Sequence, residues 1–159
     1  MSDTSPASPS STPDRSQARS AARLAAVQAL YQREMEGGEL APLLHEFHQH
    51  RIGQVIEDAH YADADVDFFD DVVSGAVARG DDIDAAITAR LAKGWTLARL
   101  DKPMKAILRA GSYELIARPD VPHASVISEY VDVAKAFYDK KESGFVNGLL
   151  DAIAKDVRG

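Results

Sequence analysis

The stretch LDKPMKAILRAGSYEL, residues 100–115, decides the fold class. Asp101 can cap the first turn of a helix that begins there, and Pro119 and Pro122 would end it. Because an α-helix has 3.6 residues per turn, the apolar spacing in this stretch predicts an amphipathic helix with one face in a core. The residues on that face are Met104, Ile107, Leu108, Gly111 and Leu115.

The rest of the chain repeats this helical pattern. Gly37 and Gly38 would end the first helix, Gly53 is expected to bend or interrupt the second, and Asp81 and Ser143 are candidate caps of later helices. No segment alternates polar and apolar residues as a half-buried strand does, so we predict an all-α bundle of about seven helices. The six further segments with helical spacing lie within residues 24–35, 40–56, 68–77, 83–91, 126–137 and 145–153.

A polar segment precedes the first helix. Residues 1–14, MSDTSPASPSSTPD, are rich in Ser, Pro and Thr and contain no large apolar side chain apart from the first Met. Such a segment cannot bury enough surface to offset the entropy of ordering, so we expect a disordered tail. Thr12 and Pro13 suit the start of the first helix. Residues 15–159 are then expected to form a single helical domain.

Charge is unevenly distributed along the chain. The formal net charge is -7, which argues against indiscriminate coating of nucleic acid. The segment 15–33 nevertheless holds four arginines and no acid, whereas 57–71 holds seven acids and no Lys or Arg. The chain therefore has one basic segment on an otherwise acidic protein.

Several classes of chemistry lack their residues. The chain has no cysteine, which excludes disulfides and thiolate sites. It has no phosphate-binding glycine loop, GxSxG elbow or HExxH motif, and acids scattered on helices do not define a catalytic pair. Histidines at 45, 48, 50 and 60 are more typical of a surface than of a metal site. With no signal peptide or membrane span, we expect a cytoplasmic protein without catalytic site, metal or cofactor.

Two groups of residues could contact nucleic acid. Arg15, Arg19 and Arg23 form a stripe on the first helix, and guanidinium groups bind phosphates and stack on unpaired bases. Lys140 and Lys141, at the end of the sixth helix, precede Phe145, whose ring could stack on a base if it is exposed. The alternatives are a solvated basic helix face and a phenylalanine buried in the core.

The chain resembles the NusB transcription antitermination family in four blocks that follow the family's order. The blocks are RSAARLAAVQALYQ (19–32), LDKPMKAILRAGSYEL (100–115), DVPHASVISEYVDVAKAF (120–137) and GFVNGLLD (144–151). The resemblance implies two small helical bundles that share one body, with Gly148 permitting close helix packing. It also implies binding of boxA RNA in nascent ribosomal RNA transcripts as a heterodimer with NusE, with other Nus factors and RNA polymerase.

Residue by residue, the family's arginine-rich start matches Arg15, Arg19 and Arg23, and its RNA-contacting phenylalanine matches Phe145. The resemblance places the NusE contact at a second group, which would need side chains that are partly exposed. That group is Tyr31, Met104, Lys105 and Arg109.

Two other functions remain open at this point. NusB-like domains also occur in some RNA cytosine methyltransferases, so the chain could be a detached RNA-recognition part of such an enzyme. Alternatively, the arginines could face the acidic segment of a second copy, which would make the chain a self-associating module or homodimer.

Overall fold

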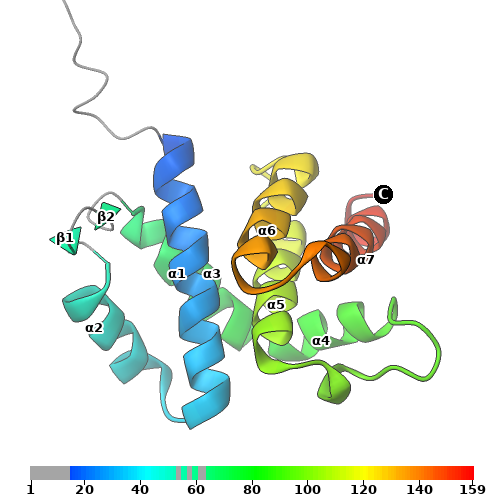
Figure 1. The fold of residues 1–159 in the computed structure, drawn as a ribbon, viewed down its shortest axis with the longest axis horizontal. Coiled ribbons are helices and arrows are strands. Elements are labelled where there is room, and N and C mark those ends of the chain that lie inside the picture. Colours follow the sequence, from blue (N-terminus) through cyan, green and yellow to red (C-terminus); the bar gives the residue numbers. More distant parts are fainter. Residues whose placement is uncertain (1–14, 53–54, 57–58, 61–63) are drawn as a thin grey trace, which may run out of the picture.

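The computed structural model describes residues 15–52, 55–56, 59–60 and 64–159, and it confirms the all-α architecture (Figure 1). The predicted tail, residues 1–14, with Thr12 and Pro13, lies outside the described residues. The elements are α1 (Arg15–Glu36), α2 (Leu40–His50), β1 (Val55–Ile56), β2 (Ala59–His60), α3 (Val66–Ala78), α4 (Gly80–Thr88), η3 (Leu97–Arg99), α5 (Lys102–Ala117), α6 (His123–Phe137) and α7 (Lys140–Arg158).

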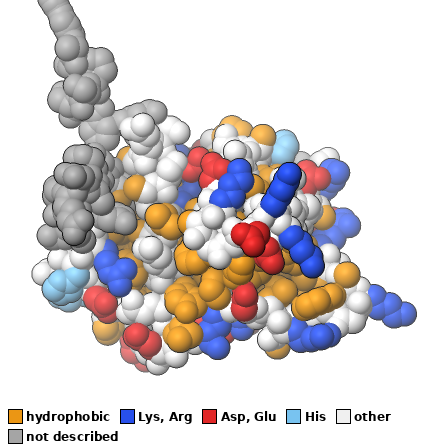
Figure 2. Space-filling model, in the orientation of Figure 1, with side chains coloured by type: hydrophobic (Ala, Val, Ile, Leu, Met, Phe, Trp, Pro, Cys, Tyr) orange, Lys and Arg blue, Asp and Glu red, His pale blue; other side chains and the backbone are white. Residues whose placement is uncertain are grey.

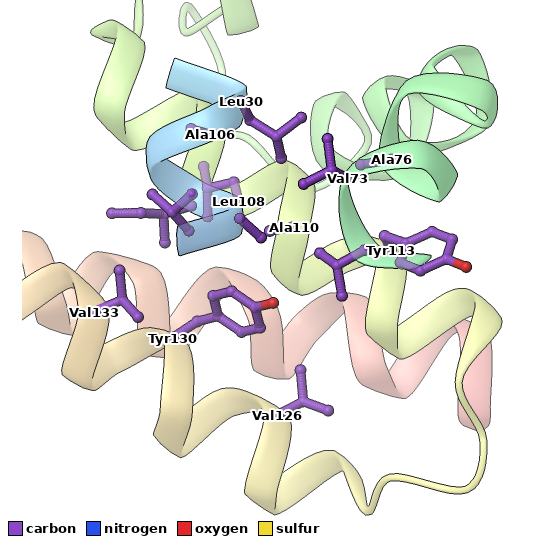
Figure 3. Packing of buried hydrophobic residues seen from close by; sticks show 14 of the residues in the cluster. Leu30, Val73, Ala76, Ala106, Leu108, Ala110, Tyr113, Val126, Tyr130 and Val133 are labelled. Carbon is purple, nitrogen blue, oxygen red and sulfur yellow. The ribbon is translucent and has the colours of Figure 1, made fainter. Parts of the chain in front are cut away.

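Helix α5 is the central element of the fold. It packs against α1, α3 and α4 on one side and against α6 and α7 on the other, so two helical bundles share it. Figure 3 shows Leu108 and Ala110 of α5 between Leu30 of α1 and Tyr130 of α6. As the sequence predicts, the Asp101 side chain accepts a hydrogen bond from the Met104 amide at 3.2 Å and caps this helix.

Two glycines allow helices to approach α5 closely. A Cβ atom on Gly75 of α3 would lie 2.2 Å from the ring of Tyr113, and one on Gly111 would lie 2.9 Å from Leu150 of α7. Gly148, which the family resemblance suggested for this role, has no neighbour that would meet a Cβ. The close packing thus depends on Gly75 and Gly111 instead.

Some element boundaries differ from the sequence pattern. The second helix ends at His50, and Val55–Ile56 pairs antiparallel with Ala59–His60. Asp81 lies inside the first turn of α4 and does not cap it.

The last helix also begins earlier than the pattern predicts. Helix α7 starts at Lys140, so Lys140 and Lys141 open this helix and do not close α6. Ser143 lies inside its first turn, where its hydroxyl donates to the Lys140 carbonyl at 3.0 Å and does not cap the helix.

A buried ion pair joins the two bundles. The Arg23 guanidinium, 4% exposed on α1, donates to both carboxylate oxygens of Glu114 on α5 at 2.7 and 2.9 Å. Tyr130 of α6 donates its hydroxyl to the same carboxylate at 2.5 Å. Burial lowers the pKa of Arg23, but the hydrogen bonds and charge of Glu114 outweigh it and raise that pKa above its usual value. Arg23 therefore stays charged.

Breaking this pair should destabilise the protein strongly. We expect Arg23→Met to lower the free energy of unfolding by about 3–5 kcal/mol, because it leaves the buried Glu114 carboxylate without its cationic partner. The double variant Arg23→Met, Glu114→Leu should recover much of that loss, whereas Arg15→Met, on the exposed end of α1, should change stability by less than about 0.5 kcal/mol. Urea unfolding measures all three; equal losses in the single and double variants would contradict the assignment.

Stability should also fall in alkali. Burial, together with the hydrogen bond to Asp71, raises the pKa of Tyr113 from 10.0 to about 12. Unfolded chains release this proton first, so the free energy of unfolding should decrease as pH rises from about 10 towards 12. Urea unfolding at successive pH values should show a shallower decrease for Tyr113→Phe. An unchanged dependence in that variant would rule out the contribution of Tyr113.

Candidate nucleic-acid interface

A polar cleft of about 630 Å³ opens between the start of α1 and the start of α6. Arg15, Ser16, Arg19 and Arg23 line its α1 side, and the other side is lined by Asp120, Val121, Pro122, Ala124, Ser125, Ser128 and Glu129. Arg15, at the start of α1, is exposed, whereas Arg23, two turns further along the same helix, is buried. The structure thus separates three arginines that the sequence treats alike.

Arg19 occupies an intermediate position in this cleft. Its guanidinium lies 4.5 Å from the centre of the Phe68 ring, and its Nε is 3.7 Å from an Asp65 carboxylate oxygen. That Nε has no hydrogen-bond acceptor among the described residues. Stacking on Phe68 and the nearby Asp65 carboxylate hold the group in place, and its Nε is buried.

The first turn of α6 adds positive potential to the cleft. It contains no acid, and Pro122 at its N-cap provides no side-chain hydrogen bond. A helix N-terminus carries partial positive charge and free amide donors, which favour anions. Helix α1 likewise has no acid in its first turn.

The carboxylates that line the cleft already have partners. Asp120 accepts hydrogen bonds from Arg118 at 3.0 and 2.9 Å, and these bonds lower the pKa of Asp120 to about 2. Glu129 accepts from the Ser20 hydroxyl at 2.5 Å and from Arg23 at 3.2 Å. Their charges are therefore largely compensated, which leaves Arg15 and Arg19 to attract an anion.

Arg158 of α7 supports one wall of the cleft through hydrogen bonds to backbone carbonyls. Arg158 of α7 donates to the carbonyls of Glu114, Leu115 and Arg118 at 2.8 to 3.0 Å. It also donates to the carbonyl of Val121, which lines the cleft, at 2.6 Å. One guanidinium thus satisfies the last carbonyls of α5 and fixes the turn that leads into α6.

Lys140, Lys141 and Phe145 lie at the other end of α6, on the first turns of α7. Both lysines are exposed, and the Phe145 ring is 39% exposed, so it is not sealed in the core. Cations at a helix N-terminus oppose its dipole, so helix stability does not explain them. Helix α6 has 15 residues, which separates this group from the cleft by about 22 Å.

The residues expected at the NusE contact are less accessible than the resemblance requires. Tyr31 is half-buried, and Met104 is buried at 5% exposure. The Lys105 ammonium lies 2.8 Å from Glu34, and Arg109 bonds both Glu34 at 3.1 Å and Asp84 at 3.0 Å. These hydrogen bonds, that of Lys105 first, lower the pKa of Glu34.

An exposed apolar residue lies on α1 close to Tyr31. Met35, on the last turn of α1, is 56% exposed. It follows Tyr31 by one helical turn and precedes the glycines at which α1 ends. Since side chains four residues apart share a helix face, Tyr31 and Met35 form one partly apolar surface.

The described residues contain neither a cluster suited to a metal ion nor a helix suited to a membrane. No group of three His, Cys, Asp or Glu in that part of the chain is arranged to hold a metal ion. His48 there lies 2.6 Å from an Asp70 carboxylate oxygen, and His45 and His50 are exposed. No helix in the same residues is both long and apolar enough to span a membrane.

Sequence reasoning missed two features of the interior and surface. The depth of Arg23 could have been inferred from Glu114, an acid three residues after Gly111 on the inward face of its helix, which requires a buried partner. The exposed Trp95 and its neighbour Arg99 lie in a turn with no periodicity, where no sequence signal predicts exposure.

The comparisons with known proteins identify the family. A sequence model of the NusB family matches residues 20–155. The chain belongs to the NusB family. Transcription antitermination protein NusB of Sphingopyxis alaskensis is 75% identical over 144 residues, covering 91% of this chain and 97% of the relative. The protein of the same name from Novosphingobium aromaticivorans is 67% identical over 141 residues, covering 89% and 95%.

Solved structures agree with this family. Thermotoga maritima NusB superposes with a TM-score of 0.70 at 28% identity, covering 91% of this chain and 93% of that one. A crystal structure of antitermination factors NusB and NusE in complex with dsRNA gives 0.70 at 28% identity, covering 88% and 98%. These matches identify the chain as a transcription antitermination factor and not an enzyme. They favour this function over the methyltransferase and self-association alternatives.

Proposed function

We propose that the chain binds boxA-type single-stranded RNA in nascent ribosomal RNA transcripts as a heterodimer with NusE. The cleft between α1 and α6 carries this proposal: its acids are already bonded, while the exposed Arg15 and the half-buried Arg19 line it beside a helix N-terminus. The solved complex of NusB and NusE with dsRNA supports NusE and RNA as classes of partner. The heterodimer would act in the cytoplasm with other Nus factors on RNA polymerase.

Each part of the surface has a distinct role in this proposal. Arg15 and Arg19 bind phosphates in the cleft, and Arg23 positions α1 against α5 without touching RNA. Phe145 stacks on an unpaired base, while Lys140 and Lys141 neutralise phosphates beside it. The exposed ring favours a single strand, since paired bases do not offer their faces.

The phosphate contacts should appear in the salt dependence of RNA binding. Arg15→Ala and Arg19→Ala should each weaken binding and flatten the slope of log affinity against log salt by about 0.7, because each removes one phosphate contact. Fluorescence anisotropy of labelled boxA-type RNA measures this. Arg79→Ala, an exposed arginine between α3 and α4, is the matched control and should leave the slope unchanged. Wild-type slopes in both cleft variants would refute the phosphate contacts.

Unpaired and sequence-specific RNA should be preferred. With NusE present, boxA-type RNA should compete better than a scrambled strand, and better than the same sequence held in a duplex, because Phe145 requires an open base. Phe145→Ala should weaken single-strand binding by about fivefold or more and leave duplex binding unchanged. Equal competition by all three RNAs would contradict the proposal.

NusE is proposed to dock on the surface of Tyr31 and Met35, and the two ligands should reinforce each other. RNA affinity should therefore rise when NusE is added. Met35→Ala should weaken NusE binding by about fivefold, as expected for loss of an apolar interface contact, without changing RNA affinity of the chain alone. Val157→Ala, an exposed apolar residue on α7, is the control. Calorimetric titration with NusE measures the affinity of both variants. Equal affinities of Met35→Ala and Val157→Ala for NusE would contradict the proposed docking surface.

A further inference from the structure

A second, more apolar groove adjoins Phe145. It has a volume of about 540 Å³ and lies between the connection from α4 to α5 and the first turns of α7. Figure 2 shows hydrophobic side chains gathered over the start of α5 and the turn from α6 to α7. Aromatic residues Trp95, Tyr138 and Phe145 line the groove, and Leu91, Leu100 and Met104 complete its apolar part.

Trp95 is the most unusual residue of this groove. Its side chain is 49% exposed, although an indole ordinarily buries most of its surface. The Arg99 guanidinium lies 4.8 Å from the ring centre, and it donates to the Gly94 carbonyl at 2.8 Å. The arginine therefore covers part of the indole and ties it to its own loop, which holds the remaining surface open in a fixed position.

The charges around the groove suit an RNA strand. Arg99 and Lys141 line it together with two carboxylates. Asp101 is already engaged as the cap of α5 and as the acceptor of the Tyr138 hydroxyl. Glu142 is half-buried and offers an acceptor to the amino group of a base. A strand that stacks on Phe145 would thus meet a cation and an open aromatic ring beside it.

We propose that this groove holds an unpaired nucleobase, stacked on Trp95, of the same RNA strand that contacts Phe145. The inference rests on the proposed RNA-binding function and extends it by one base site. Lys141 would neutralise the phosphate between the two stacked bases. A nucleotide fits this groove better than a protein side chain does, because the aromatic rings can stack on its base and the cations can bind its phosphate.

The chain has a single tryptophan, so its fluorescence reports on this groove alone. Titration with boxA-type RNA should quench Trp95 and saturate together with the anisotropy of labelled RNA. RNAs in which one nucleotide at a time is abasic should identify one position that binds but no longer quenches. Trp95→Leu should weaken RNA binding by about fivefold or more, whereas Trp95→Phe should keep most of the affinity. Phe137→Leu is the control, an exposed aromatic that does not line the groove.

Three results would overturn the inference while leaving the proposed function intact. They are binding without a change in Trp95 fluorescence, wild-type RNA affinity in Trp95→Leu, and occupation of the groove by NusE. The last is tested with 5-fluorotryptophan in this chain, whose single fluorine resonance should shift with RNA and not with NusE alone. No binding of RNA in the anisotropy measurement, with or without NusE, would instead overturn the proposed function and the inference with it.

Discussion

The ion pair between Arg23 and Glu114 connects the elements on which the candidate interface depends. It links α1 to α5, and the same carboxylate accepts a hydrogen bond from Tyr130 of α6. A buried charge is tolerated only when its partners are well placed, so the three helices cannot shift independently. The start of α1 and the start of α6 therefore keep a fixed relation, and the cleft between them is preformed.

The arginines of α1 illustrate how one helical stripe can serve two purposes. Arg23 is flanked by small alanines, which let α1 approach α5 closely enough to bury the guanidinium. Arg19, one turn earlier, stacks on Phe68 at the edge of the core. Arg15 lies beyond the packed helices and faces solvent. The burial of each arginine, which the neighbouring helices determine, decides whether it stabilises the fold or remains accessible.

Much of this architecture follows from local sequence, because helical periodicity and the Asp101 cap depend on neighbouring residues alone. What the sequence did not predict depends on distant contacts. Arg23 and Glu114 are 91 residues apart, so their pairing is invisible to a helical pattern. Val55 and Ile56 fit the apolar spacing of a helix, yet their partners lie five and three residues further along, in β2.

The candidate site was predicted in part for the same reason. Phe145 has helical spacing with Leu149, which a core residue would share, and only its neighbours in space leave the ring exposed. A helical projection of α5 places Lys105 and Arg109 on its polar face. It cannot show that Glu34 and Asp84, on other helices, form ion pairs with them. Charge type is readable from sequence, whereas charge compensation is a property of the folded state.

The bonds from Arg158 to the carbonyls at the end of α5 bear on how the protein forms in the cell. A chain emerges from the ribosome N-terminus first, so Arg15 and Arg19 are available long before residue 158 has been made. Until then, the turn between α5 and α6, which lines the opposite side of the cleft, lacks its hydrogen bonds from Arg158. Helices α1 and α7 consequently both support one cleft, and its α6 wall is fixed only after α7 has been synthesised.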